Sequence, residues 1–196
     1  VPIPVIDIAV SMRDLSGFLE DRKAGSKVLK SSEIEFSCDK EELLKNLEKA
    51  LYFSFITVYA QGMSLLHIAS KYYKYDLKLE DIATIWRGGC IIRASLLKDI
   101  RTVYSQQTDL SNLMMSDIFS KKLLQSQEGI RNIIQIGVSS SIPIPALMGS
   151  LAYFDSFRSG WLPANLIQAQ RDNFGAHTYA RTDREGIFHT IWNQKE

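Results

Sequence analysis

Two residues near the end of the chain, Arg171 and His177, have side chains able to bind a phosphate or a carboxylate. They flank Gly175 in the stretch 162–192, which reads LPANLIQAQRDNFGAHTYARTDREGIFHTIW. A guanidinium donates paired hydrogen bonds to such anions, and an imidazole beside a phosphate can be protonated near neutral pH. Gly175 allows a turn that would point both at one anion. From the residues alone we favour the ordinary alternatives, an arginine opposing a helix dipole and a surface histidine.

Other side chains that could bind an anion or a metal have simpler structural interpretations. Arg13 is a lone arginine in an apolar-rich helix, where a solvated or snorkelling side chain is usual. His67 is expected to be a satisfied core histidine, because no His, Cys or carboxylate stands at metal-binding spacing from it. Arg87 and Arg93 flank two glycines, and we expect them to pair with carboxylates or to cap helix ends.

The cysteines and the glycines suggest no cofactor site of their own. Cys38 and Cys90 are far apart and belong to no metal-spaced cluster, so we expect two reduced thiols, buried or half-buried. Neither GxGxxG nor GxxxxGK[ST] occurs in the sequence, so no dinucleotide or P-loop phosphate site is expected. We expect no metal.

The elements that would position these side chains are predicted to be helices. Apolar residues recur at helical spacing, and no segment alternates with period two for long. The expected fold is therefore all-α, with about seven to nine helices around one long central helix. The expected helices span residues 5–29, 40–73, 77–86, 91–104, 117–139, 146–158 and 163–175.

The expected helix 40–73 is the centre of the fold. Asp39 and Glu42 resemble a capping box at its start, and at about 1.5 Å per residue the helix is about 50 Å long. From Ala50 it is apolar on every side, so other elements must surround it. The uncharged spans 50–70 and 132–154 could mimic membrane helices, but we interpret both as buried helices of a soluble bundle.

Length, composition and net charge limit the number of domains and the kinds of partner. The 196 residues suit one domain or two small ones, with 45% apolar and 23% charged residues. A net charge of +1 gives no bulk field to attract nucleic acid or an anionic membrane. We expect no signal peptide at the start, and the missing initiator Met suggests that Val1 is not the natural beginning. We expect a cytoplasmic protein.

The closing residues 176–196 are expected to form an extended tail. They mix polar and aromatic side chains with no sustained period. Disordered tails are usually poor in aromatics, so we expect this one to lie against another surface. His189 and Trp192 are the expected docking residues.

The chain also resembles one enzyme family. The strings NLIQAQRD (165–172), FGAHTY (174–179) and FHT (188–190) with a following Trp resemble the C-terminal signature of 6-phosphogluconate dehydrogenase. A second signature, IWRGGCIIR, lies at 85–93, and YAQG (59–62) and AGSK (24–27) also fit. The resemblance runs essentially end to end.

The resemblance implies an enzyme domain with known tasks. Residues 1–175 would be the helical C-terminal domain, and residues 176–196 a tail that docks on the partner subunit of a homodimer. The family oxidatively decarboxylates 6-phosphogluconate to ribulose 5-phosphate in the pentose phosphate pathway, with NADPH formed. NADP and the catalytic lysine and glutamate belong mainly to an upstream Rossmann domain. The isolated domain would therefore be inactive.

The resemblance also assigns substrate-binding residues. Arg13 matches the arginine of the family's first helix, Arg171 the arginine before Asp, and His177 the histidine after Gly-Ala. In the family the last two reach into the neighbouring subunit's site. No catalytic or coenzyme-binding residue is expected in this chain.

Two other functions stay open. One is a non-catalytic helical scaffold that only dimerises. The other is the helical domain of a related 3-hydroxyacid dehydrogenase, which we disfavour because its small substrates carry no phosphate and need no set of two arginines and a histidine.

Overall fold

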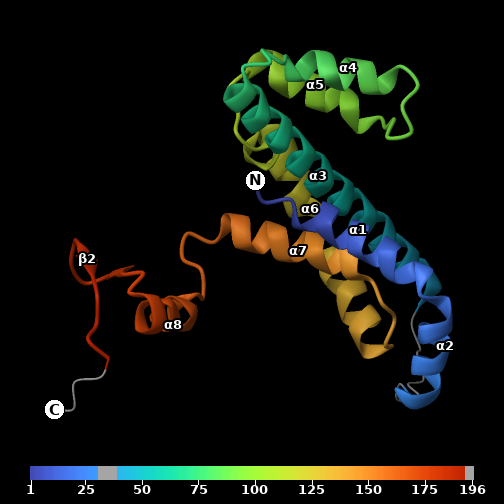
Figure 1. Ribbon diagram of the computed structural model, residues 1–196. Helices are drawn as coiled ribbons and strands as arrows, with labels where there is room; N and C mark the ends of the chain where they lie inside the picture. The colour runs from blue at the N-terminus through green and yellow to red at the C-terminus, as the bar shows by residue number, and fades with distance from the viewer. Residues whose placement is uncertain (31–38, 193–196) are drawn as a thin grey trace. The chain divides into compact units, whose positions relative to one another are not determined.

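The computed structural model describes residues 1–30 and 39–192, and it divides into two compact units, residues 1–155 and 156–196. Almost all regular structure in the described ranges is helical, which confirms the predicted all-α class (Figure 1). The elements are α1 (Pro4–Gly17), α2 (Leu19–Val28), α3 (Lys40–Tyr73), α4 (Leu79–Arg87), α5 (Leu96–Gln106), the 3-10 helix η1 (Leu113–Met115), α6 (Asp117–Ser139), α7 (Pro145–Arg158), α8 (Asn165–Gly175), β1 (Tyr179–Ala180) and β2 (Ile187–Phe188).

The core of the first unit lies where α3 packs along α6, with η1 against both. Asp39 caps α3, because its carboxylate accepts a hydrogen bond of 3.0 Å from the Glu41 N–H. Large side chains fill the interior without exposure, among them Phe53, Ile56, Phe119 and Leu123. The predicted long central helix is confirmed, with the bounds expected of it.

The expected helix 5–29 is two helices, which corrects the prediction. α1 ends at Gly17 and α2 begins at Leu19, and Phe18 between them has non-helical angles of φ −84° and ψ 58°. Glycine costs a helix backbone entropy, so the break falls beside one. Gln61 of α3 fixes the start of α1, since its Oε1 accepts a hydrogen bond of 3.1 Å from the Val5 N–H.

The helix expected over 91–104 begins later, at Leu96. Gly89 has φ 130°, which only glycine adopts readily. The chain then turns, and the Arg93 N–H donates to the Cys90 carbonyl at 3.0 Å. The two glycines therefore separate α4 from α5, which pack together as a pair. Arg87 lies in the last turn of α4, where a cation opposes the helix dipole.

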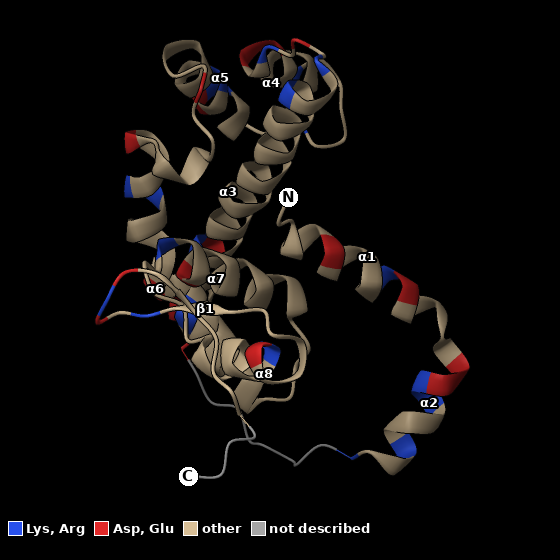
Figure 2. Cartoon of the chain, turned by 60° about the vertical axis from the view of Figure 1, so that its left-hand side comes forward, with Lys and Arg blue, Asp and Glu red and all other residues tan. Residues whose placement is uncertain are grey.

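Part of α3 is not covered in the single chain, although we expected it to be surrounded. Between Ala50 and Ser70 it carries no Lys, Arg, Asp or Glu (Figure 2). One group of its apolar side chains is nevertheless exposed: Leu51, Phe55, Leu65 and Ile68. By length and composition α3 could cross a membrane, which is weak support for a span because core helices of soluble proteins pass the same test.

Leu124 and Val138 of α6 are exposed, although the helical spacing of apolar residues over 117–139 predicts both on the buried side. Leu124 and Val138 follow buried positions of α6, at Leu123 and Gly137, by one residue. One residue is about 100° of rotation around a helix, which turns both side chains outward. Cys90 is also exposed, since it lies in the turn after α4, while Cys38 lies outside the described residues. His67 is buried, at 9% exposure, as expected.

The second unit pairs α8 with a small hairpin. α8 begins at Asn165, two residues after the expected start at Pro163. Beyond α8 the chain forms β1 and β2, which pair antiparallel with Tyr179 opposite Phe188. We call residues 176–192 the arm. Two-residue strands are too short to show an alternating pattern, so the sequence indicated only an extended tail.

The expected domain boundary between residues 175 and 176 stays a prediction. The compact units part between residues 155 and 156, so α8 is grouped with the arm. The expected boundary concerned docking on a partner subunit, which a single chain does not test.

Candidate functional site

The end of α8 brings Arg171 and His177 into one short structure. Both side chains are exposed. Their positions depend on how α8 ends. Ala176 takes left-handed angles of φ 47° and ψ 39°, and its N–H donates to the Asp172 carbonyl at 3.0 Å. The predicted end of the helix at Gly175 is therefore confirmed.

Asp172, next to Arg171, is the residue on which the arm is folded. Its side chain is completely buried. Oδ1 accepts hydrogen bonds from the Thr178 N–H at 3.0 Å and from His189 Nδ1 at 2.8 Å. Oδ2 accepts from the Thr190 N–H at 2.9 Å and from the Trp192 indole N–H at 3.0 Å. One carboxylate thus holds three separate parts of the arm.

These hydrogen bonds keep the carboxylate ionised. Burial by itself raises the pKa of Asp172, since it penalises the charged form. The hydrogen bonds from His189, the Thr190 N–H and Trp192 outweigh burial and lower the pKa to about 2. An ionised carboxylate only accepts hydrogen bonds, so Nδ1 of His189 must be the donor. His189 and Trp192, the expected docking residues of the tail, both bind Asp172 of α8, and docking of the tail on a partner subunit stays a prediction.

Gln168, one turn before Asp172, links the two candidate ligands. Its Oε1 accepts a hydrogen bond of 3.3 Å from Arg171 Nη1. Its Nε2 donates to the carbonyl of Thr178, the residue after His177. The backbone of Thr178 is therefore held from both sides, by Asp172 at its N–H and by Gln168 at its carbonyl.

His177 is placed by its contact with Gly175. A Cβ built on Gly175 would lie 2.7 Å from Cδ2 and 2.8 Å from Nε2 of His177. The imidazole therefore occupies the space that any larger residue at 175 would need. Its ring packs against the end of α8, on which Arg171 also lies.

Chemically, the arrangement offers two exposed donors to an anion. A guanidinium can bind phosphate or carboxylate with paired hydrogen bonds. The imidazole adds a further donor, and a charge when protonated. Arg13 lies on α1, in the first unit, and its side chain is exposed. Arg171 lies on α8 and His177 packs against the residue that ends it, both in the second unit, whereas Arg13 belongs to the first.

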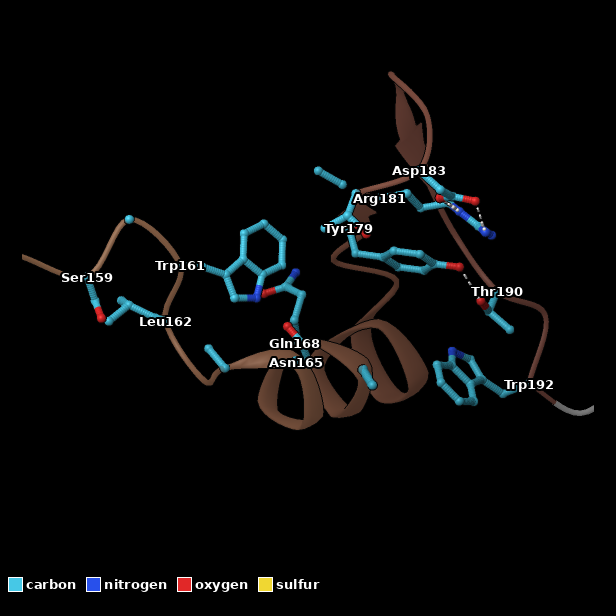
Figure 3. Close-up of a pocket in the computed structure, with 15 residues that line it drawn as sticks. Ser159, Trp161, Leu162, Asn165, Gln168, Tyr179, Arg181, Asp183, Thr190 and Trp192 are labelled. Atoms are coloured by element: carbon cyan, nitrogen blue, oxygen red, sulfur yellow. Dashed lines mark hydrogen bonds and ion pairs between the residues drawn. The ribbon is translucent and has the colours of Figure 1, made fainter. Parts of the chain in front are cut away.

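A pocket of about 770 Å³ opens beside the arm (Figure 3). Trp161, Asn165, Gln168, Tyr179 and Trp192 are among its lining residues. The Tyr179 hydroxyl is hydrogen-bonded to the Thr190 hydroxyl at 2.7 Å, which ties one wall together. Neither Arg171 nor His177 is among the residues that line the pocket.

In residues 1–30 and 39–192, no three His, Cys, Asp or Glu side chains lie together in a way that could hold a metal ion. The Gly88–Gly89 turn separates two helices and is not followed by a phosphate-binding helix start, since α5 begins at Leu96.

Sequence reasoning missed two positions, Asp172 and Gln168. In the sequence, Asp172 falls in the last turn of the expected helix 163–175, where an acidic residue is unfavourable to the helix dipole. That local misfit was the available signal, because such a residue needs another reason for its place. Gln168 gave no signal of its own, since its partner Thr178 lies ten residues later.

Comparison with known proteins gives a consistent result. The family model for the C-terminal domain of 6-phosphogluconate dehydrogenase matches residues 1–192. A decarboxylating 6-phosphogluconate dehydrogenase of Lactococcus lactis subsp. lactis is 46% identical over 192 residues, which cover 98% of this chain and 41% of the relative. An NADP(+)-dependent, decarboxylating enzyme of Bacillus subtilis is 46% identical over 194 residues, with the same coverage of both.

A solved structure agrees with the fold. The 6-phosphogluconate dehydrogenase of Plasmodium falciparum, studied in its apo form and with NADP+ or 6-phosphogluconate, superposes with a TM-score of 0.91 at 41% identity. The alignment covers 98% of this chain and 42% of that one. The chain thus spans about two fifths of the length of the relatives it matches.

Proposed function

Because the chain belongs to the 6-phosphogluconate dehydrogenase family, whose C-terminal domain it matches over residues 1–192, we propose that it is the substrate-binding and dimerising part of a longer enzyme. That enzyme would oxidise and decarboxylate 6-phosphogluconate to ribulose 5-phosphate and CO2. NADP, when bound, supplies the hydride acceptor. The names of the bacterial relatives support the reaction and the coenzyme.

The observation that carries the proposal is the pair Arg171 and His177 at the end of α8. The substrate bears a phosphate dianion and a carboxylate, and both need charged or strongly polar donors. Arg171 is held by Gln168, and His177 is packed on Gly175, so the two donors are ordered before any ligand arrives. Donors ordered in advance bind more tightly, because less side-chain freedom is lost on binding.

Arg13 and a second subunit complete the proposed site. We assign the phosphate to Arg171 and His177 of one subunit together with Arg13 of its partner. Exposure of Arg13 on α1 leaves it free to take part. The apolar side chains exposed on α3, among them Leu51 and Phe55, support a homodimer, since single chains rarely leave such patches open to water. The arm would dock on the partner.

The coenzyme and the reacting groups are assigned to the remainder of the longer protein. The sequence holds no Gly-rich dinucleotide turn, so these 196 residues do not fit NADP by themselves. We therefore expect the domain alone to be inactive, and the whole enzyme to work in the cytoplasm. Gel filtration of the domain tests dimerisation separately from activity.

The test is substitution of Arg171 and His177 in the full-length protein. Each change to Ala should raise KM for 6-phosphogluconate about 10- to 100-fold, since a hydrogen bond to a charged group contributes about 1.5–3 kcal/mol and each 1.4 kcal/mol is tenfold. KM for NADP should not change. Arg184→Ala is a matched control, because it also removes an arginine of the arm. The Arg184 guanidinium lies over the Phe188 ring, 5.3 Å from the ring centre.

The alternatives predict different results. A non-catalytic scaffold predicts no turnover by the wild type. A role in dimerisation alone predicts turnover that does not depend on Arg171 or His177. A 3-hydroxyacid dehydrogenase domain, which the family match already disfavours, predicts preference for an unphosphorylated hydroxy acid. Comparing 6-phosphogluconate with gluconate separates it from our proposal.

A further inference from the structure

We propose that Asp172 and Gln168 are positioning residues, which set the geometry of Arg171 and His177 by holding Thr178 between them. The inference rests on the proposed function of that pair. Neither positioning residue needs to touch the substrate. Each acts through the backbone that carries His177, and Gln168 also acts through the Arg171 side chain.

The first support is the way the arm is held. Across residues 156–192, Asp172 is the only residue that is buried. The arm therefore has almost no apolar core of its own, and polar contacts must order it. Four hydrogen bonds from the arm, at residues 178, 189, 190 and 192, end on this one carboxylate. Hydrogen bonds to a buried charge are stronger than neutral ones, and this set leaves the charge well compensated.

The second support is the backbone around His177. Ala176 and Thr178 both have positive φ, of 47° and 62°. Such angles are unfavourable for residues other than glycine and persist only where the surroundings hold them. Asp172 and Gln168 provide that restraint at Thr178, at its N–H and at its carbonyl. Without it, we expect residues 176–178 to relax and the His177 ring to leave Gly175.

The third support is the double role of the Gln168 side chain. Its amide offers both an acceptor and donors. The acceptor binds the Arg171 guanidinium, and a donor binds the Thr178 carbonyl. Lysine, glutamate or an apolar residue at 168 would supply at most one of these functions. The amide therefore couples the position of Arg171 to that of His177.

The test uses Asp172→Asn and Gln168→Glu in the full-length enzyme. Asn has the shape of Asp, but its NH2 group faces N–H donors that need an acceptor. Glu at 168 still accepts from Arg171 but cannot donate to Thr178. We expect KM for 6-phosphogluconate to rise at least tenfold in Asp172→Asn and about threefold in Gln168→Glu. KM for NADP should stay within twofold of the wild type, and kcat should fall less than KM rises.

A matched control is Asp183→Asn. Asp183 is a carboxylate of the same arm, but it is exposed and pairs locally with Arg181 at 2.7 Å. We expect no change in either KM. Asp172→Glu restores the charge and should recover part of the affinity lost in Asp172→Asn, because the carboxylate again accepts from the arm.

A second readout does not depend on turnover. Trypsin cleaves after arginine, and Arg181 and Arg184 lie in the arm. Release of the arm should increase cleavage there at least fivefold in Asp172→Asn relative to the wild type. If Asp172→Asn fails to fold, Gln168→Glu decides by the same two readouts.

The outcomes separate this inference from the proposed function. If Arg171→Ala raises KM but Asp172→Asn and Gln168→Glu do not, the positioning role is overturned and the function stands. If the wild type shows no turnover of 6-phosphogluconate, the proposed function fails. The restraint of the arm is then judged by trypsin alone, where unchanged cleavage in both variants overturns it.

Discussion

The imidazole of His177 lies so close to the Cα of Gly175 that a Cβ at residue 175 would come within 2.7 Å of it. Real side chains essentially never show a Cβ contact that short. The glycine that ends α8 therefore also leaves the space into which His177, a proposed substrate-binding residue, packs its ring. Gly175 thus has two roles, because it ends the helix and makes room for the histidine.

Gly175→Ala should displace His177 and weaken substrate binding. Alanine is favoured over glycine in a helix by about 0.8–1 kcal/mol, so we do not expect a large loss of stability. We expect KM for 6-phosphogluconate to rise about tenfold in steady-state kinetics, with a melting temperature close to that of the wild type. Gly160→Ala is the control, because nothing lies within 4 Å of a Cβ there. Equal kinetics for the two variants would contradict the seating role.

The anchoring of the arm by Asp172 should weaken in acid. The folded pKa of Asp172 is about 2, below its ordinary value of 3.8. A carboxyl whose pKa is lowered on folding stabilises the fold above its unfolded pKa, and that stability is lost as pH falls through the folded pKa. We expect the arm to loosen between about pH 4 and pH 2. The difference in fluorescence between wild type and Trp192→Phe reports it, since the Trp192 indole binds Asp172. An arm that does not loosen between pH 4 and pH 2 would argue against this carboxylate as the anchor.

A buried hydrogen bond should stabilise the first unit. Asn112 is 4% exposed, and its amide donates to the Tyr153 hydroxyl at 2.8 Å while its Oδ1 accepts from the Met114 N–H at 3.0 Å. Asn112→Ala removes both, and should cost about 1–3 kcal/mol in the free energy of unfolding. Tyr153→Phe should cost less. Urea unfolding of both single variants and the double variant measures their coupling. If the losses in the free energy of unfolding simply add in the double variant, Asn112 and Tyr153 are not energetically coupled.

Tyr104 should tolerate loss of its hydroxyl. Its side chain is fully buried, and its oxygen has no hydrogen-bond partner among the residues that the structure describes. Burial raises the pKa of Tyr104, so the group stays neutral at all ordinary pH values. An unpaired buried hydroxyl costs about 1–3 kcal/mol, so Tyr104→Phe should leave stability unchanged or raise it by about 1 kcal/mol. A clear fall in the urea midpoint would reveal a partner for that hydroxyl. Tyr153→Phe, which removes a paired hydroxyl, is the comparison.

The sequence by itself determined the helices and most of their ends. Apolar spacing depends on residues three and four apart, so it could be followed along the chain without knowledge of the fold. Asp39 and Gly175 marked a helix start and a helix end for local reasons, and both are confirmed. Short strings were also enough to name the family, which the comparison bears out.

Only the tertiary structure decided which residues hold the candidate site together. The partners of Asp172 lie up to 20 residues away, and those of Gln168 up to ten, so no local period relates them. The sequence likewise did not reveal that one face of α3 is exposed, because an apolar helix has the same sequence pattern whether this chain or another covers it. Hydrogen bonds between distant residues form only after the chain has turned back on itself, and that turn depends on packing that no single stretch contains.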